Sequence, residues 1–108
     1  NSEFRYLYFL TRSYPRFEEP FYLLGLRYLK EKTLNKSAYE EAEKCFKRAA
    51  EINPKHISAR MSLAELYYEK LRYKEAAAEI DEVLKISPDL KNGLYLKNLI
   101  KGFIYDEF

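Results

Sequence analysis

The sequence contains few of the residues from which catalytic or metal centres are built. Its 108 residues include no tryptophan, one methionine, one cysteine and one histidine. The single cysteine, Cys45, excludes an internal disulfide, and the lone His56 leaves a zinc site without the three or four ligands that it needs. Glycine-rich phosphate loops and nucleophile elbows are also missing. We therefore expect no enzyme active site, no metal and no cofactor, and we expect His56 to be a surface or packing residue.

The sequence also lacks a block of one charge and a long apolar run. Nineteen Lys and Arg residues alternate with seventeen Asp and Glu residues, whereas a nucleic-acid-binding domain usually concentrates its basic residues. The densest basic stretch, residues 30–36, is interrupted by Glu31. The main apolar cluster, residues 4–10, contains Arg5 and is too short to span a bilayer. We expect no nucleic-acid partner and no direct membrane insertion, with the cytoplasm as the default location.

What is present is an internal repeat. Residues of one segment recur 34 positions later, and residues of a preceding segment recur 39 positions later. The five extra residues must lie between two helices of the first copy, so we expect an enlarged turn over residues 32–37 and a compact turn over 70–72. The matching pairs are Tyr39 and Tyr73, Glu41 and Glu75, Ala42 and Ala76, Ile52 and Ile86, Pro54 and Pro88, Leu24 and Leu63, Gly25 and Ala64, and Tyr28 and Tyr67.

The repeated residues have a physical role in helix packing. Small residues at Gly25 and Ala64 would let two antiparallel helices cross closely. Pro54 and Pro88 would end the second helix of each copy, and Pro15 occupies the same closing position upstream. These spacings predict an all-α protein of about six helices.

The pattern resembles the tetratricopeptide repeat family, in which an aromatic, Leu-Gly, Tyr, Ala, Phe and Pro follow in fixed register. The second copy departs from it at Arg60, which stands where the first copy has Phe21, so we expect one weakened packing contact. The resemblance implies a right-handed superhelical α-solenoid of antiparallel helix pairs. The first copy shows the pattern as Phe21, Leu24, Gly25, Tyr28, Ala42, Phe46, Ala49 and Pro54.

The register predicts one tetratricopeptide domain over residues 1–108. It comprises an N-terminal packing helix (1–15), a first repeat (18–54), a second repeat (57–88) and a C-terminal capping helix (89–108). The last helix is expected over residues 90–105. Because the first residue is Asn, we expect the chain to be a fragment of a longer one.

A solenoid of this kind has a concave face lined by the first helix of each pair. We expect this groove to bind a helical or apolar peptide of a protein partner, without catalysis. The resemblance also implies that the cationic clamp some family members use for chaperone tails is absent. The alternative is that the same side chains pack against neighbouring repeats. The predicted groove residues are Tyr22, Leu26, Leu29, Met61, Glu65, Tyr68, Glu69, Asn92, Tyr95 and Leu99.

Two further functions stay open. The first is self-association into a homo-oligomer through the apolar C-terminal end, where Phe103, Ile104 and Phe108 are poorly explained in an isolated chain. The second is an accessory targeting domain of a larger enzyme.

Overall fold

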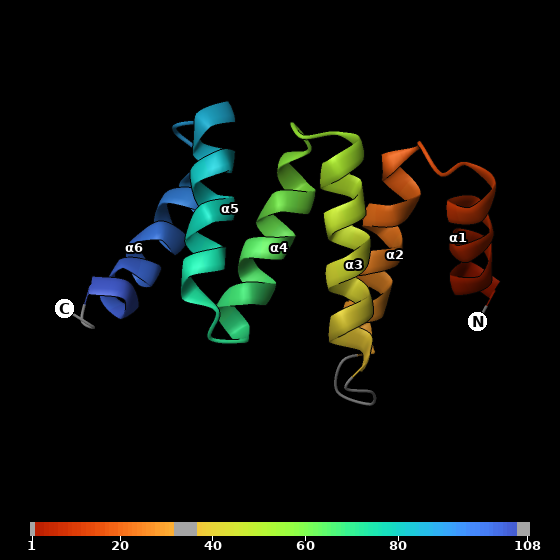
Figure 1. Ribbon diagram of the computed structural model, residues 1–108, viewed down its shortest axis with the longest axis horizontal. Coiled ribbons are helices and arrows are strands. Elements are labelled where there is room, and N and C mark those ends of the chain that lie inside the picture. The colour runs from red at the N-terminus through yellow and green to blue at the C-terminus, as the bar shows by residue number, and fades with distance from the viewer. Residues whose placement is uncertain (1, 32–36, 106–108) are drawn as a thin grey trace. The chain divides into compact units, whose positions relative to one another are not determined.

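In residues 2–31 and 37–105, the part of the chain that the computed structural model describes, there are six helices and no strand (Figure 1). The all-α prediction with six helices is therefore confirmed. Most of the expected enlarged turn falls on residues 32–36, outside the described residues. The helices are α1 (Ser2–Ser13), α2 (Glu18–Lys30), α3 (Ser37–Ile52), α4 (Ile57–Glu69), α5 (Tyr73–Ile86) and α6 (Lys91–Tyr105).

Proline ends three of the helices, as the register predicted. Helices α1, α3 and α5 each stop two residues before a proline, at Pro15, Pro54 and Pro88. Proline fixes φ and keeps the preceding residue out of the helical region, so the chain must leave the helix there. The last turn still closes its backbone bonds, because the N–H of Ser87 donates to the carbonyl of Val83 at 2.8 Å.

The chain divides into two compact units, Asn1–Ala59 and Arg60–Phe108. The first contains α1, α2, α3 and the start of α4, and the second contains the rest of α4 with α5 and α6. A single domain over the whole chain stays a prediction.

In the first unit, α2 and α3 pack against each other as an antiparallel pair (Figure 1). The contact is close because Gly25 faces the ring of Phe46, which is completely buried. A Cβ atom added at Gly25 would lie 2.6 Å from the Cε1 atom of Phe46. The prediction of a small residue at this crossing is confirmed.

Helix α1 packs against α2 and also reaches α3. Leu7 of α1 lies in one buried cluster with Leu24 and Cys45. The rings of Phe4 and Tyr28 meet edge to face, with centroids 5.0 Å apart. Such aromatic pairs add to the stabilisation from burial alone, so α1 is fixed by both apolar burial and ring geometry.

In the second unit, α4 and α5 run in opposite directions (Figure 1), and side chains of the two helices contact each other. Arg60, near the start of α4, reaches Glu79 of α5 with a 2.9 Å bond between Nη1 and Oε1. Both side chains are mostly buried, at 17% and 22% exposure. The expected weak packing contact at Arg60 is thus replaced by an ion pair, which the sequence pattern did not predict. The buried core residues of this unit are Met61, Leu63, Ala64, Leu66, Tyr67, Ala76, Ile80, Val83, Leu96 and Ile100.

The turn between α4 and α5 is compact, as predicted, and it contains the one backbone conformation unusual for a side chain in the described residues. Leu71 has a φ of 64° and its side chain is 70% exposed. Left-handed backbone costs an L-residue roughly 1–2 kcal/mol, whereas glycine adopts it readily. The apolar side chain gains little burial in return.

We expect Gly25→Ala to destabilise the protein by about 1–3 kcal/mol, because the buried ring of Phe46 cannot move away from the new methyl group. Thermal unfolding followed by circular dichroism measures the effect. Gly102→Ala is the matched control, since a Cβ there meets nothing within 4 Å. It should stabilise α6 by about 0.5 kcal/mol through helix propensity. A neutral Gly25→Ala variant would contradict the close crossing.

We expect Leu71→Gly to stabilise the protein by about 1 kcal/mol, because glycine removes the strain of the positive φ. Leu71→Ala is the control, since alanine keeps the Cβ atom and therefore the strain. Chemical denaturation of both variants separates backbone relief from loss of the exposed apolar side chain. Equal stability of the two variants would contradict this explanation.

Candidate functional site

The predicted groove residues lie on three helices, α2, α4 and α6, at spacings that place each set on one helix face. Those of α2 belong to the first unit, and those of α4 and α6 belong to the second. Each unit therefore carries its own set of predicted groove residues.

In the first unit, the predicted groove residues of α2 are half-buried. Part of each side chain packs within the unit, and part is exposed to solvent. The ring centroid of Tyr22 lies 6.0 Å from that of Phe46 and 4.9 Å from that of His56. Leu26 and Leu29 follow at helical spacing, and both are half-buried. Packing within the repeat, the alternative to partner binding, therefore explains part of the burial of the Tyr22 side chain.

His56 is a packing residue, as expected, with a structural task that the sequence pattern did not reveal. Its Nδ1 atom accepts a hydrogen bond of 3.0 Å from the backbone N–H of Ala59, in the first turn of α4. Its Nε2 atom lies 3.7 Å from Oε2 of Glu19. A side chain that accepts from a free N–H at a helix start stabilises that helix, so His56 caps α4.

The thiol of Cys45 has low reactivity. Its side chain is buried in the first unit, and burial raises the pKa of the thiol to about 12, with the carboxylate of Glu41 adding to the effect. Because the thiolate is the reactive form, a thiol with this pKa is a poor nucleophile at neutral pH. In residues 2–31 and 37–105, no three metal-binding side chains cluster together.

In the second unit, the predicted α4 residues differ in exposure. Met61 is 8% exposed and contributes to the core. Glu65 and Glu69 are exposed one turn apart. Partial desolvation raises the pKa of Glu65, and the neighbouring charge of Glu69 raises it further. Two carboxylates on one face repel each other when both are ionised.

Helix α6 presents an apolar stripe that is open to solvent. Asn92, Tyr95 and Leu99 lie on one face, where Tyr95 is 67% exposed and Leu99 is 36% exposed. The buried Leu96 and Ile100 lie on the adjoining face of the helix, about 60–100° around the axis from Leu99. The exposed residues therefore do not serve the core of their own unit.

The structure adds Phe103 to this stripe and connects it to α4. Phe103 follows Leu99 by one turn, and its ring lies 6.0 Å from that of Tyr68. It also stacks on Tyr73, with centroids 4.3 Å apart and planes 7° from parallel. The two predicted sets of the second unit thus meet at an aromatic cluster of Tyr68, Tyr73 and Phe103. Sequence reasoning assigned Tyr73 to repeat packing alone and did not connect it to this face.

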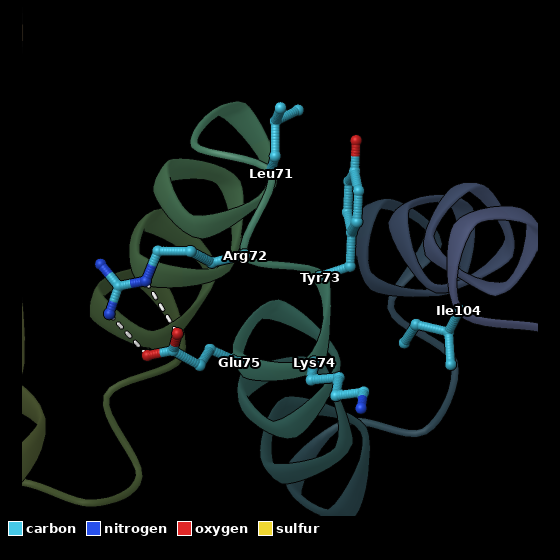
Figure 2. A pocket seen from close by; sticks show the side chains of 6 residues that line it. All are labelled: Leu71, Arg72, Tyr73, Lys74, Glu75 and Ile104. Atoms are coloured by element: carbon cyan, nitrogen blue, oxygen red, sulfur yellow. Dashed lines mark hydrogen bonds and ion pairs between the residues drawn. The ribbon is translucent and has the colours of Figure 1, made fainter. Parts of the chain in front are cut away.

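A shallow hollow lies beside the aromatic cluster (Figure 2). Tyr73 and Ile104 stand on one side of it, while Arg72 points away and is bonded to Glu75, with 2.8 Å between Nε and Oε1. Phe103 is 45% exposed and Ile104 is half-buried, so neighbours within the unit cover part of the apolar end. Phe108, the third predicted self-association residue, lies outside the described residues.

A second hollow, which sequence reasoning missed, lies on the outward face of α1. Its lining residues are Phe4, Arg5, Tyr8, Phe9 and Arg12. The spacing of Arg5, Phe9 and Arg12, at steps of four and three, could have indicated a shared helix face. Sequence reasoning treated residues 4–10 as an apolar run within a packing helix and did not predict an outward-facing stripe. Within the described residues, no helix is both long and apolar enough to be a candidate for crossing a membrane.

Comparison with known proteins bears on the whole arrangement. Residues 34–100 match the family model described as tetratricopeptide repeat. The chain is also similar to the UDP-N-acetylglucosamine–peptide N-acetylglucosaminyltransferase of Giardia intestinalis, with 30% identity over 100 residues. That alignment covers 89% of this chain and only 6% of the relative. Helix pairs, closing prolines, small crossing residues and the family match agree, and the chain belongs to the tetratricopeptide repeat family.

Proposed function

We propose that the chain is a non-catalytic scaffold that binds a helical or apolar segment of a partner protein. The observation that supports this most directly is the exposed face of α6 in the second unit. Tyr95 is 67% exposed there although α6 buries its other face. A large aromatic side chain that is exposed and does not contribute to the core of its own unit is typical of a protein-binding surface. Membership of the tetratricopeptide repeat family suggests protein partners in general, without specifying their chemistry.

The chemistry of the second unit narrows the partner. The aromatic cluster of Tyr68, Tyr73 and Phe103 supplies a firm apolar contact at one end of the stripe. Glu65 and Glu69 supply negative charge on the neighbouring helix. An amphipathic helix with apolar residues on one face and a Lys or Arg beside them fits both features. The half-buried Tyr22, Leu26 and Leu29 of the first unit offer a similar, less open stripe.

Two alternatives keep specific support. The relative in Giardia intestinalis is named as a glycosyltransferase, and this chain matches only 6% of its length, so an accessory domain of a larger enzyme is the second candidate. Self-association through Phe103 and Ile104 is the third, since Phe103 remains 45% exposed. Sedimentation across a range of concentration distinguishes it: a monomer at every concentration rules out self-association.

The double variant Tyr95→Ser and Leu99→Ser should weaken binding to helical peptides by about tenfold, because it removes the exposed apolar anchors of α6. Binders would first be selected against the unmodified chain from a displayed library of 16-residue amphipathic helices, and their affinities then measured by fluorescence anisotropy. Leu94→Ser is the matched control, since Leu94 is 43% exposed on a different face of the same helix. Binders that tolerate the double variant and lose affinity with the control would reject the α6 face.

Glu65→Gln should raise the thermal stability at neutral pH and leave it unchanged at about pH 3. The folded protein raises the pKa of Glu65, so ionisation of this group disfavours folding as the pH rises above its unfolded pKa. The amide removes that cost, and at low pH both side chains are uncharged. Melting curves at the two pH values give the result. An equal effect at both pH values would show that ionisation of the partly desolvated Glu65 is not the cause.

A further inference from the structure

The outward face of α1 is a second surface with its own chemistry. The inner face of this helix is occupied, because Leu7 and Thr11 are buried, and Phe4 lies at its edge, where it packs on Tyr28 and also lines the hollow. The outer face carries Phe9, which is 58% exposed, together with the exposed Arg5. The core of the unit therefore needs none of the outward side chains.

These side chains have a regular order. Arg5, Phe9 and Arg12 follow at steps of four and three residues, so they form one stripe with the ring between two guanidinium groups. Seven residues of α-helix rise about 10 Å, which sets the distance along the axis between the two cationic positions. Tyr8 lies next to Phe9 and widens the apolar centre of the hollow.

Contacts within α1 orient the guanidinium group of Arg12. Nη2 of Arg12 donates a 2.6 Å hydrogen bond to the Tyr8 hydroxyl, and its guanidinium carbon lies 4.8 Å from the centre of the Tyr8 ring. These contacts orient the guanidinium, and the Tyr8 hydroxyl and ring carry no carboxylate that would cancel its charge. The only carboxylate of α1, that of Glu3, lies on another face of the helix, more than 100° around the axis from Arg5. The stripe is thus positive, with no acidic residue of its own helix beside it.

We propose that the outward face of α1 binds an acidic amphipathic helix whose carboxylates lie seven residues apart on either side of an apolar pair. Charge complementarity and spacing both support this occupant. Each guanidinium can hold a carboxylate through two parallel hydrogen bonds, and Phe9 with Tyr8 receives the apolar pair. Tyrosine, phenylalanine and arginine are also enriched at protein interfaces. The surface lies in the first unit and is independent of the α6 stripe.

Single-stranded nucleic acid is the competing occupant, since it also uses aromatic and cationic side chains. A strand needs a basic groove that follows several phosphates. Helix α1 offers two guanidinium groups at its hollow, and aromatic side chains form the rest of the lining. This composition favours an apolar partner with two negative charges.

The test uses the whole 108-residue chain and two synthetic helical peptides of identical composition. The first peptide has Glu at positions seven apart flanking a Leu pair, and the second has the same Glu residues moved to the opposite face. Anisotropy titration should show the first peptide binding about fivefold more tightly, with the difference lost in 1 M salt. The double variant Arg5→Gln and Arg12→Gln should remove this preference. The control variant Lys91→Gln and Lys101→Gln, with two exposed lysines of α6, should retain it.

A charge-reversal variant distinguishes loss of the two positive charges from damage to the fold, because a damaged fold would not gain a new preference. Arg5→Glu with Arg12→Glu should reject the acidic peptide and prefer a version in which Lys replaces Glu. Equal affinity for both Glu peptides, or no effect of the arginine variants, would overturn the proposal. Tighter binding of a 12-nucleotide single strand would assign the surface to nucleic acid instead. A dimer of the unmodified chain that the arginine variants dissociate would assign it to a second copy.

Discussion

The close approach of α2 and α3 at Gly25 is the contact on which the first unit depends. The fully buried ring of Phe46 occupies the space that a side chain at Gly25 would need, so the two helices lie nearer than larger residues would allow. That separation brings Leu24 into contact with the cluster of Leu7 and Cys45, which in turn holds α1. The ring of Tyr22 reaches Phe46 and His56 for the same reason.

Both candidate surfaces contain aromatic side chains that the cores do not bury. In the first unit, Phe46 and several alanines fill the interior, while Tyr6, Tyr8 and Phe9 of α1 are exposed. In the second unit, Ile80 and Ile100 fill the interior, while Tyr95 remains in solvent. Aromatic side chains in solvent lose the stabilisation that burial would give, and contact with a partner would recover it.

Much of the fold could be predicted from one sequence because the repeat fixes the register. The closing positions at Pro54 and Pro88 follow from covalent constraints on proline, and the glycine at the crossing follows from helix geometry. The candidate site could be predicted less well. Spacing placed Tyr95 and Leu99 on one face, yet it could not tell that Met61 is buried, because exposure depends on what packs on every side of a helix.

The sequence by itself determined the six helices, the proline-terminated ends of three of them and the family, since these depend on local backbone preferences and on a pattern that repeats every 34 residues. Only the tertiary structure decided the pairings between distant side chains. It joined Arg60 to Glu79 and stacked Phe103 on Tyr73. It also left the stripe of Arg5, Phe9 and Arg12 uncovered within its unit. Such outcomes depend on which helix faces meet, and a spacing along the chain does not contain that information.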